Sequence, residues 1–142
     1  IVKSFQEISK KFFIINHDQD FNSFNITKSI EIVYGLRNFI GNANKFSKDK
    51  IFISIKSDKN FTEIIIEDDG DGYPKDVLSK IGEPYIKSLK SSTKSKSGLG
   101  LGIFIGKTLL EKNQANILCE NSKVRSGAKV SIKWKNKDLL NL

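Results

Sequence analysis

Three glycines at alternate positions precede an apolar stretch with helical spacing. From Ser97 to Ile105 the chain reads Ser-Gly-Leu-Gly-Leu-Gly-Ile-Phe-Ile. Glycine lets the backbone approach a ligand closely, and a helix N-terminus attracts anions through its free N–H groups and its dipole. The pattern predicts that Gly98, Gly100 and Gly102 bind a polyphosphate through backbone N–H groups. A flexible joint into a packed helix fits the same stretch when it is taken alone.

A cluster of carboxylates at the end of an apolar strand is the second candidate. The isoleucines at 64–66 lead into Glu-Asp-Asp-Gly-Asp-Gly at 67–72, which predicts a buried strand that ends in a glycine turn. The carboxylate of Asp68 is then fixed and partly shielded from water, which suits one selective hydrogen bond to a ligand. An Asx turn that only ends the strand fits these residues equally well.

The stretch from 29 to 47 predicts a long helix with two distinct faces, capped by Thr27 or Ser29. Apolar residues at helical spacing form the face expected to be buried: Ile32, Leu36, Phe39, Ala43 and Phe46. A polar stripe lies one position earlier, about 100° round the helix: Glu31, Gly35, Asn38, Asn42 and Lys45. Polar side chains beside a buried face predict a helix that lines a pocket. The alternative is a helix face that contacts only solvent.

The other patterns place these residues in an α+β fold, a two-layer α/β sandwich with about five strands and about three helices. Further helices are predicted at 1–11, 74–81 and 99–112. Strands are predicted at 12–16, 51–57, 61–68, 116–121 and 128–135, with 24–26 as a candidate partner for 12–16.

Length and composition limit the alternatives. The chain has 142 residues, enough for one domain with a core, and we expect 1–142 to be a single domain. It begins with Ile1 and contains no methionine, so we expect a fragment of a longer protein. Cys119 alternates with Ile117 on a predicted strand, which favours a buried structural thiol.

The net charge of +8 comes in part from a lysine-rich segment at 87–97. That segment has no aromatic residue on which a base could stack, and no nucleic-acid-binding motif accompanies it. Specific binding of nucleic acid is therefore not expected.

The helix carrying Asn38 and Asn42, the 67–72 turn and the 97–105 stretch resemble, in this order, the N, G1 and G2 boxes of one ATP-binding fold. Histidine kinases, gyrase, Hsp90 chaperones and MutL repair proteins share it. The resemblance runs from about Lys28 to Trp134. It implies the Bergerat fold, with a mixed, mostly antiparallel sheet covered by helices on one face and a mobile lid over ATP at about 86–98.

The resemblance assigns roles to individual residues. It implies that Asp68 accepts a hydrogen bond from the adenine amino group and that Asn42 holds Mg²⁺ against the phosphates. Lys45 would face the phosphates and Phe46 the adenine, although Phe46 suits a plain core position equally well. The remaining residues implied in nucleotide binding are Gly70, Gly72, Tyr85, Gly98, Leu99, Gly100, Leu101 and Gly102. Of these, Tyr85 stands at the base of the lid, where packing is its expected role.

The residue one turn before Asn42 separates branches of this superfamily. Gyrase, Hsp90 and MutL proteins have a glutamate there that activates water, whereas this chain has Asn38, and an amide cannot remove a proton. Asn38 therefore favours phosphoryl transfer to a partner side chain, in which positioning and charge neutralisation determine the rate.

Further segments, at 31–38, 81–85 and 103–111, resemble the RegB/PrrB group of redox-responsive sensor kinases. This implies the cytoplasmic catalytic domain of a protein anchored in the inner membrane, which forms a homodimer. Such a protein transfers phosphate from Mg·ATP to a histidine of its dimerisation domain and then to a response regulator. The chain has no acceptor-histidine motif, and Gly41 stands where that group tends to have glutamate. The fragment alone is therefore expected to bind ATP without phosphorylating itself.

Two other functions remain open at this point. A serine kinase of the anti-sigma type also lacks attached acceptor helices, and a nucleotide-binding scaffold module would use ATP only to order its lid. His17, the only histidine, lies where a predicted strand meets a turn, so we expect a surface residue there and not a phosphoacceptor.

Overall fold

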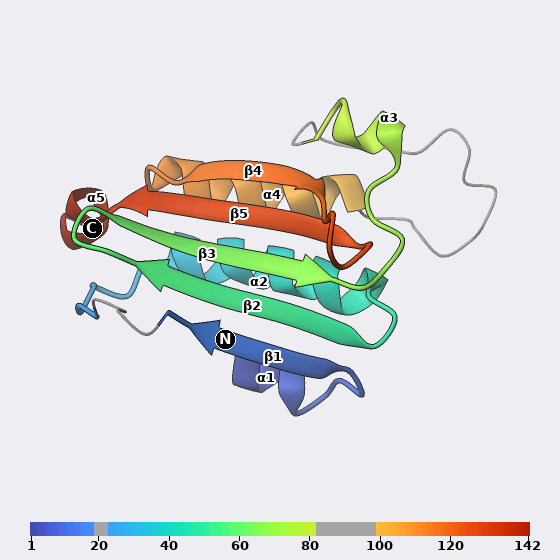
Figure 1. The fold of residues 1–142 in the computed structure, drawn as a ribbon. Coiled ribbons are helices and arrows are strands. Elements are labelled where there is room, and N and C mark those ends of the chain that lie inside the picture. Colours follow the sequence, from blue (N-terminus) through green and yellow to red (C-terminus); the bar gives the residue numbers. More distant parts are fainter. Residues whose placement is uncertain (19–22, 82–98) are drawn as a thin grey trace.

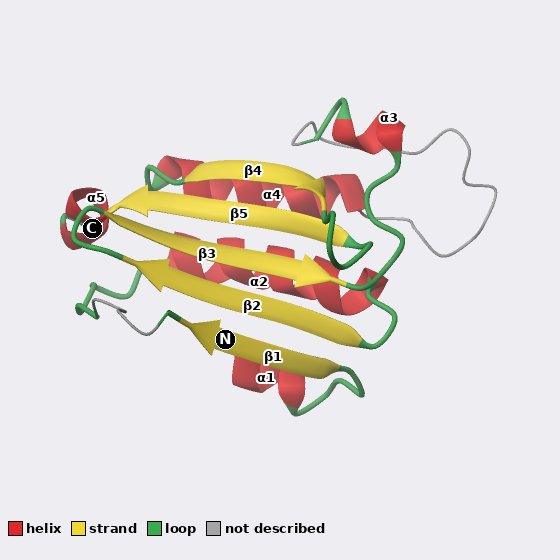
Figure 2. Cartoon of the chain, in the orientation of Figure 1, coloured by secondary structure: helices red, strands yellow, loops and turns green. Residues whose placement is uncertain are grey.

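The computed structural model describes residues 1–18, 23–81 and 99–142. Five strands form one sheet in the order β1-β2-β3-β5-β4, with the helices on one of its faces (Figures 1 and 2). The strands are β1 (Phe12–His17), β2 (Lys50–Ser57), β3 (Phe61–Asp68), β4 (Asn116–Asn121) and β5 (Ala128–Lys135). The helices are α1 (Val2–Gln6), α2 (Ile30–Phe46), α3 (Lys75–Leu78), α4 (Leu99–Lys112) and α5 (Asn136–Leu140). The predicted α+β two-layer sandwich is confirmed.

The sheet is mixed, because β1 pairs with β2 in parallel while the other pairs are antiparallel. The predicted pairing of 12–16 with a strand at 24–26 is wrong, since 24–26 form no strand. Parallel neighbours need a long crossover, and the connection through α2 supplies it. Phe24 instead packs, partly buried, against the core.

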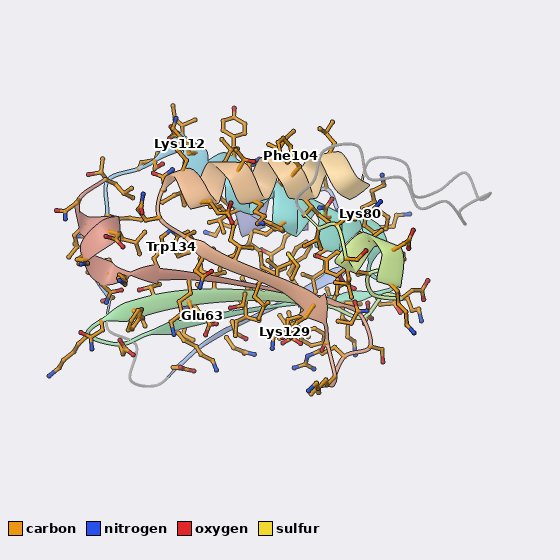
Figure 3. The ribbon with its side chains drawn as sticks, turned by 90° about the horizontal axis from the view of Figure 1, so that it is seen from above. Glu63, Lys80, Phe104, Lys112, Lys129 and Trp134 are labelled. Atoms are coloured by element: carbon orange, nitrogen blue, oxygen red, sulfur yellow. The ribbon has the colours of Figure 1, made fainter. Side chains whose placement is uncertain are left out.

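The core lies between the sheet and the two long helices. Strand residues two apart share one face, so alternate positions of β2, β3 and β5 meet the buried stripes of α2 and α4. The most enclosed side chains are Phe39, Ile51, Ile66, Ile103, Leu110 and Ile132. In Figure 3, Trp134 lies between the layers, whereas Glu63 and Lys129 lie on the uncovered face of the sheet.

The two long helices pack antiparallel along a seam in which glycines allow close approach. Ser29 caps α2, since its Oγ accepts from the Ile32 N–H at 3.3 Å. A Cβ added at Gly35 would lie 2.5 Å from Leu110 Cγ, and one at Gly106 would lie 2.9 Å from the Phe39 ring. Because such contacts are shorter than atoms tolerate, both positions need glycine for the helices to approach this closely.

Three short elements differ from the prediction. Helix α1 ends at Gln6 and not at 11, because Ser9 and Lys11 turn their side chains to the end of α2. Helix α3 ends at Leu78 and not at 81. Helix α5 was not predicted, and the buried Asn136 holds it to the β2–β3 turn by donating from its backbone N–H to the Asn60 carbonyl at 2.8 Å.

We expect Gly106→Ala to destabilise the protein by about 1–3 kcal/mol, because the new methyl group would overpack against the buried Phe39 ring. Gly41→Ala is the matched control on the other long helix. A Cβ there would meet only Phe5 at 3.8 Å, an ordinary contact, so the change should stabilise the helix by about 0.5–1 kcal/mol. Urea unfolding of both variants measures the difference. Equal effects would mean that the seam is not tightly packed.

Candidate functional site

A pocket opens beside the C-terminal end of α2. It lies at the end of the sandwich where β3 ends and β5 begins, which Figure 1 shows. The space, counted with the solvent at its mouth, is about 570 Å³. Most of its wall is apolar, and the side chains of Asn42, Asp68 and Asp71 supply polar groups. An apolar pocket with few polar groups is typical of a small-molecule site. Phe46 and Gly72, both predicted to bind nucleotide, also line it.

Asp68 is the most buried charged group of this pocket, with 3% of its surface exposed. Its Oδ1 accepts hydrogen bonds from the backbone N–H of Gly70 at 2.8 Å and of Ala128 at 3.2 Å. These bonds hold the carboxylate at the junction of β3, the following turn and β5. The predicted glycine turn after a buried strand is therefore present.

Two glycines make room for this carboxylate. A Cβ at Gly127 would lie 2.2 Å from Asp68 Oδ1, and one at Gly70 would lie 2.9 Å from the same oxygen. The sequence interpretation singled out Gly70 but gave Gly127 no role in the site. Only the pairing of β3 with β5 brings Gly127 to Asp68, and no local pattern indicates that contact.

Gly72 and Tyr73 continue the pocket wall, and Asn121 of β4 holds them in place. The Asn121 Oδ1 accepts from the Tyr73 N–H at 2.6 Å, and its Nδ2 donates to the Tyr73 carbonyl at 3.0 Å. Gly72 has a φ of +76°, and a Cβ there would lie 2.7 Å from Asn121 Oδ1. Glycine is thus required at 72 both by backbone conformation and by space.

Tyr73 is buried in the wall of the pocket, and Cys119 is partly buried near it. Burial raises the pKa of the Cys119 thiol to about 11, while nearby Lys107 and Tyr73 act in the opposite direction. At neutral pH the thiol stays protonated, which agrees with the predicted structural thiol. The sequence interpretation gave Tyr73 and Asn121 no role in the site, because only the packing of distant segments brings them together.

The neighbouring carboxylates of Asp68 and Asp69 have opposite pKa shifts. Burial raises the pKa of Asp68 above its ordinary value of 3.8, although the N–H groups of Gly70 and Ala128 act against it. Burial also acts to raise the pKa of Asp69, but backbone N–H donors of Lys48, Asp49 and Lys50 outweigh it and hold the pKa below 3.8. Asp68 is therefore the carboxylate whose charge is costly in the ligand-free protein.

Asn42 lines the pocket, with its amide directed at α4. A Cβ at Gly102 would lie 3.2 Å from its Oδ1 and 3.4 Å from its Nδ2. Nδ2 is buried, and no residue of the described part of the chain accepts a hydrogen bond from it. A rotation of the Asn42 amide by about 180° would exchange its two atoms and put Oδ1 where Nδ2 lies. An unpaired buried amide is costly, so it suits a site that a ligand completes.

The predicted polar stripe of α2 faces the seam with α4 along most of its length. Glu31 forms an ion pair with Lys112 at 3.3 Å, at the end of α4. Gly35, Asn38 and Asn42 contact successively earlier turns of α4. Asn38 donates from Nδ2 to the Tyr34 carbonyl at 2.8 Å, which leaves its Oδ1 directed elsewhere. The stripe is neither solvent-facing nor wholly a pocket wall, and only Asn42 reaches the pocket.

The other predicted residues are less completely described. Lys45 is exposed, and its ammonium lies 5.2 Å from the centre of the Phe46 ring. Gly100, Leu101 and Gly102 lie in the first turn of α4, where Leu101 is 42% exposed. Leu99 begins this helix. Tyr85, Gly98 and the predicted lid at 86–98 lie outside the described residues.

Residues 27–138 match the family of histidine kinase-, DNA gyrase B- and Hsp90-like ATPases. This match covers most of the chain, so the protein belongs to that family. The predicted resemblance is confirmed, and ATP is the nucleotide that the family implies.

Within the described ranges, no helix has both the length and the apolar character needed to cross a membrane.

The chain is also similar to parts of individual sensor proteins. The chain is 34% identical to the sensor histidine kinase RegB of Cereibacter sphaeroides over 102 residues, which are 68% of this chain and 22% of that protein. It is 34% identical to the sensor protein SrrB of Staphylococcus aureus over 84 residues, 58% of this chain and 14% of that protein. The chain thus spans less than a quarter of the length of these relatives.

Solved structures show the same fold. The mycobacterial sensor histidine kinase MprB superposes with a TM-score of 0.74 at 21% identity, over 94% of this chain and 89% of that one. The catalytic domain of the histidine kinase ThkA gives a TM-score of 0.71 at 18% identity, over 94% and 85% of the two chains. The architecture is that of histidine kinase catalytic domains.

We expect Asp68→Asn to raise the melting temperature of the ligand-free protein at pH 7. The raised pKa means that ionisation of Asp68 disfavours the folded state. This loss of stability is absent below the ordinary pKa of 3.8 and develops as the pH rises through the higher folded-state pKa. The gain from the variant should therefore shrink as the pH is lowered from 7 towards 4, as thermal unfolding at several pH values would reveal.

Asp69→Asn is the matched control, because Asp69 is the next residue and its pKa is shifted in the opposite direction. Its lowered pKa contributes stability that is present above 3.8 and is lost as the pH falls through the folded-state pKa. This variant should lower the melting temperature at pH 7. Shifts of the same sign for both variants would contradict the contrast between the two carboxylates.

Proposed function

We propose that this chain is the ATP-binding catalytic domain of a sensor histidine kinase and that it donates the γ-phosphate of Mg·ATP to a histidine on a separate domain. The observation that carries the proposal is the buried Asp68 carboxylate in an otherwise apolar pocket. The proposal includes a single domain at 1–142 within a longer protein, with the lid at about 86–98.

The Oδ2 oxygen of the Asp68 carboxylate is available to accept a hydrogen bond from a ligand. Both backbone donors reach Oδ1, and no donor in the described ranges reaches Oδ2. The exocyclic amino group of adenine is a donor that would fill this position, between the apolar wall and Phe46. A charge that is costly when unpaired gives a large preference for a ligand that donates to it.

Asn42 suits the phosphate end of the same ligand. The described residues contain no group of three or more His, Cys, Asp or Glu side chains that could hold a metal by themselves. Magnesium commonly binds through few protein oxygens together with substrate phosphates and water. Once its amide is rotated, Asn42 would present Oδ1 beside Gly102 for this role, and Mg²⁺ bound there would neutralise phosphate charge. Lys45 and the backbone of the first turn of α4 would add to the binding of the phosphates.

Asn38 favours transfer to another side chain over hydrolysis. Its amide donates to the Tyr34 carbonyl and cannot act as a general base towards water. The nucleophile then has to come from a partner, for which we propose the histidine of a dimerisation domain in the same protein, followed by transfer to a response regulator. The whole protein would be a homodimer anchored in the inner membrane, with this domain in the cytoplasm.

Calorimetry with a non-hydrolysable ATP analogue tests the binding roles. We expect Asp68→Ala to abolish binding with or without Mg²⁺, because the base loses its acceptor. Asn42→Ala should bind as wild type without Mg²⁺ and lose the additional affinity that Mg²⁺ confers. Asn42→Asp, which keeps an oxygen ligand, is the control and should retain that Mg²⁺ dependence. Equal losses in both alanine variants under both conditions would contradict the division of roles.

Transfer itself requires the missing acceptor. Supplied with labelled ATP and a dimerisation domain from the same protein, the chain should label that domain on histidine and should do so more slowly without Mg²⁺. Labelling of a serine would favour the anti-sigma type of kinase. Binding of ATP without any transfer would favour a scaffold module.

A further inference from the structure

One carboxylate fixes the short segment that joins α2 to β2. Asp69 accepts from the N–H of Lys48 at 2.8 Å, of Asp49 at 3.1 Å and of Lys50 at 3.1 Å, using both of its oxygens. Its own N–H donates to the Lys50 carbonyl at 3.3 Å. Charge-assisted bonds to three consecutive N–H groups tie this segment to the turn that carries Asp68.

The preceding turn of the same segment is held by a cation. The Lys11 ammonium donates to the Ser47 carbonyl at 2.6 Å and also to the Asn44 carbonyl. A positive charge on the last carbonyls of a helix is favourable for the helix dipole. The end of α2 is thus fixed by a lysine on its carbonyls and by Asp69 on the N–H groups that follow.

Phe46 links this segment to the pocket. It is the last residue of α2, and its side chain lines the pocket beside Asp68. Its carbonyl oxygen lies so close to Gly70 that a Cβ there would be 2.3 Å away. Because the end of α2 and the turn after β3 touch without a side chain between them, the placement of the Phe46 ring depends on how the segment is anchored.

We propose that Asp69 is a positioning residue for the nucleotide pocket: it anchors the α2–β2 segment so that Phe46 stays in place beside Asp68. Asp69 itself touches no ligand, since its two oxygens are turned to the backbone of the segment. This inference rests on the proposed ATP-binding function and adds a residue to it. The two neighbouring carboxylates then have different roles. Asp68 would face the adenine base, and Asp69 would hold the α2–β2 segment that forms part of the pocket wall.

Calorimetry on the whole chain tests the inference with Mg²⁺ and a non-hydrolysable ATP analogue, well below the melting temperature of each variant. We expect Asp69→Asn to weaken binding about tenfold with a stoichiometry near one, because the folded molecules hold Phe46 less firmly. Asp49→Asn, an exposed carboxylate in the same segment, is the control and should bind within about twofold of wild type.

A double-mutant cycle separates positioning from general loss of stability. In a Phe46→Ala background, Asp69→Asn should change the affinity by less than about twofold, because the side chain that it positions is gone. A full tenfold loss in that background would overturn the inference, and so would unchanged binding by Asp69→Asn alone. No binding by the wild type would overturn the proposed function as well, which distinguishes the two failures.

Amide exchange in the wild type tests the same linkage if the variant does not fold. Since coupling between two events is reciprocal, nucleotide binding should slow exchange of the Lys48, Asp49 and Lys50 amides that Asp69 holds. Unchanged exchange of these amides on saturation with the nucleotide would overturn the inference.

Discussion

The site depends on one buried charge, the carboxylate of Asp68, which the fold encloses and only half satisfies. It has 3% of its surface exposed, and its hydrogen bonds from the described residues reach only Oδ1. It therefore carries a desolvation cost that a more stable protein would avoid. Proteins often keep such destabilising groups where a ligand completes them. Enclosing the Asp68 carboxylate requires glycine at 70 and 127, because a side chain at either position would occupy the space of the carboxylate or of its neighbours.

Helix α2 connects that charge to the rest of the molecule. Its apolar stripe packs on the sheet through Phe39 and Ala43, and its polar stripe packs on α4 through positions where one helix or the other has glycine. Close approach at Gly35 and Gly106 leaves little freedom for the helices to slide. Asn42 is therefore placed by the packing of two helices, since no described residue accepts a hydrogen bond from its Nδ2. A polar group placed in this way can remain unpaired until a ligand arrives, because the surrounding contacts hold it.

Much of the fold could be predicted from the sequence because the signals are local. A run of isoleucines identified β3, alternation identified β5, helical spacing identified α2, and the order of the three motifs indicated the family. The errors concern contacts between distant segments. The parallel pairing of β1 with β2 depends on the connection through α2, and α5 depends on the burial of Asn136 against the β2–β3 turn. The site prediction left out Asn121, Gly127 and Asp69. Each of them contacts the backbone of another segment, which is distant in the sequence or carries no recognisable motif.

The amide at Asn38 gives a physical reason for dividing the proposed reaction between domains. A site that binds ATP next to a general base would hydrolyse it, and the energy of the γ-phosphate would be lost to water. Asn38, already bonded to its own helix, offers no such base. Bound ATP would then persist until a partner brings a nucleophile that needs positioning more than activation. Under the proposed function, the absence of a catalytic carboxylate at this position is what lets a signal elsewhere in the protein decide when transfer occurs.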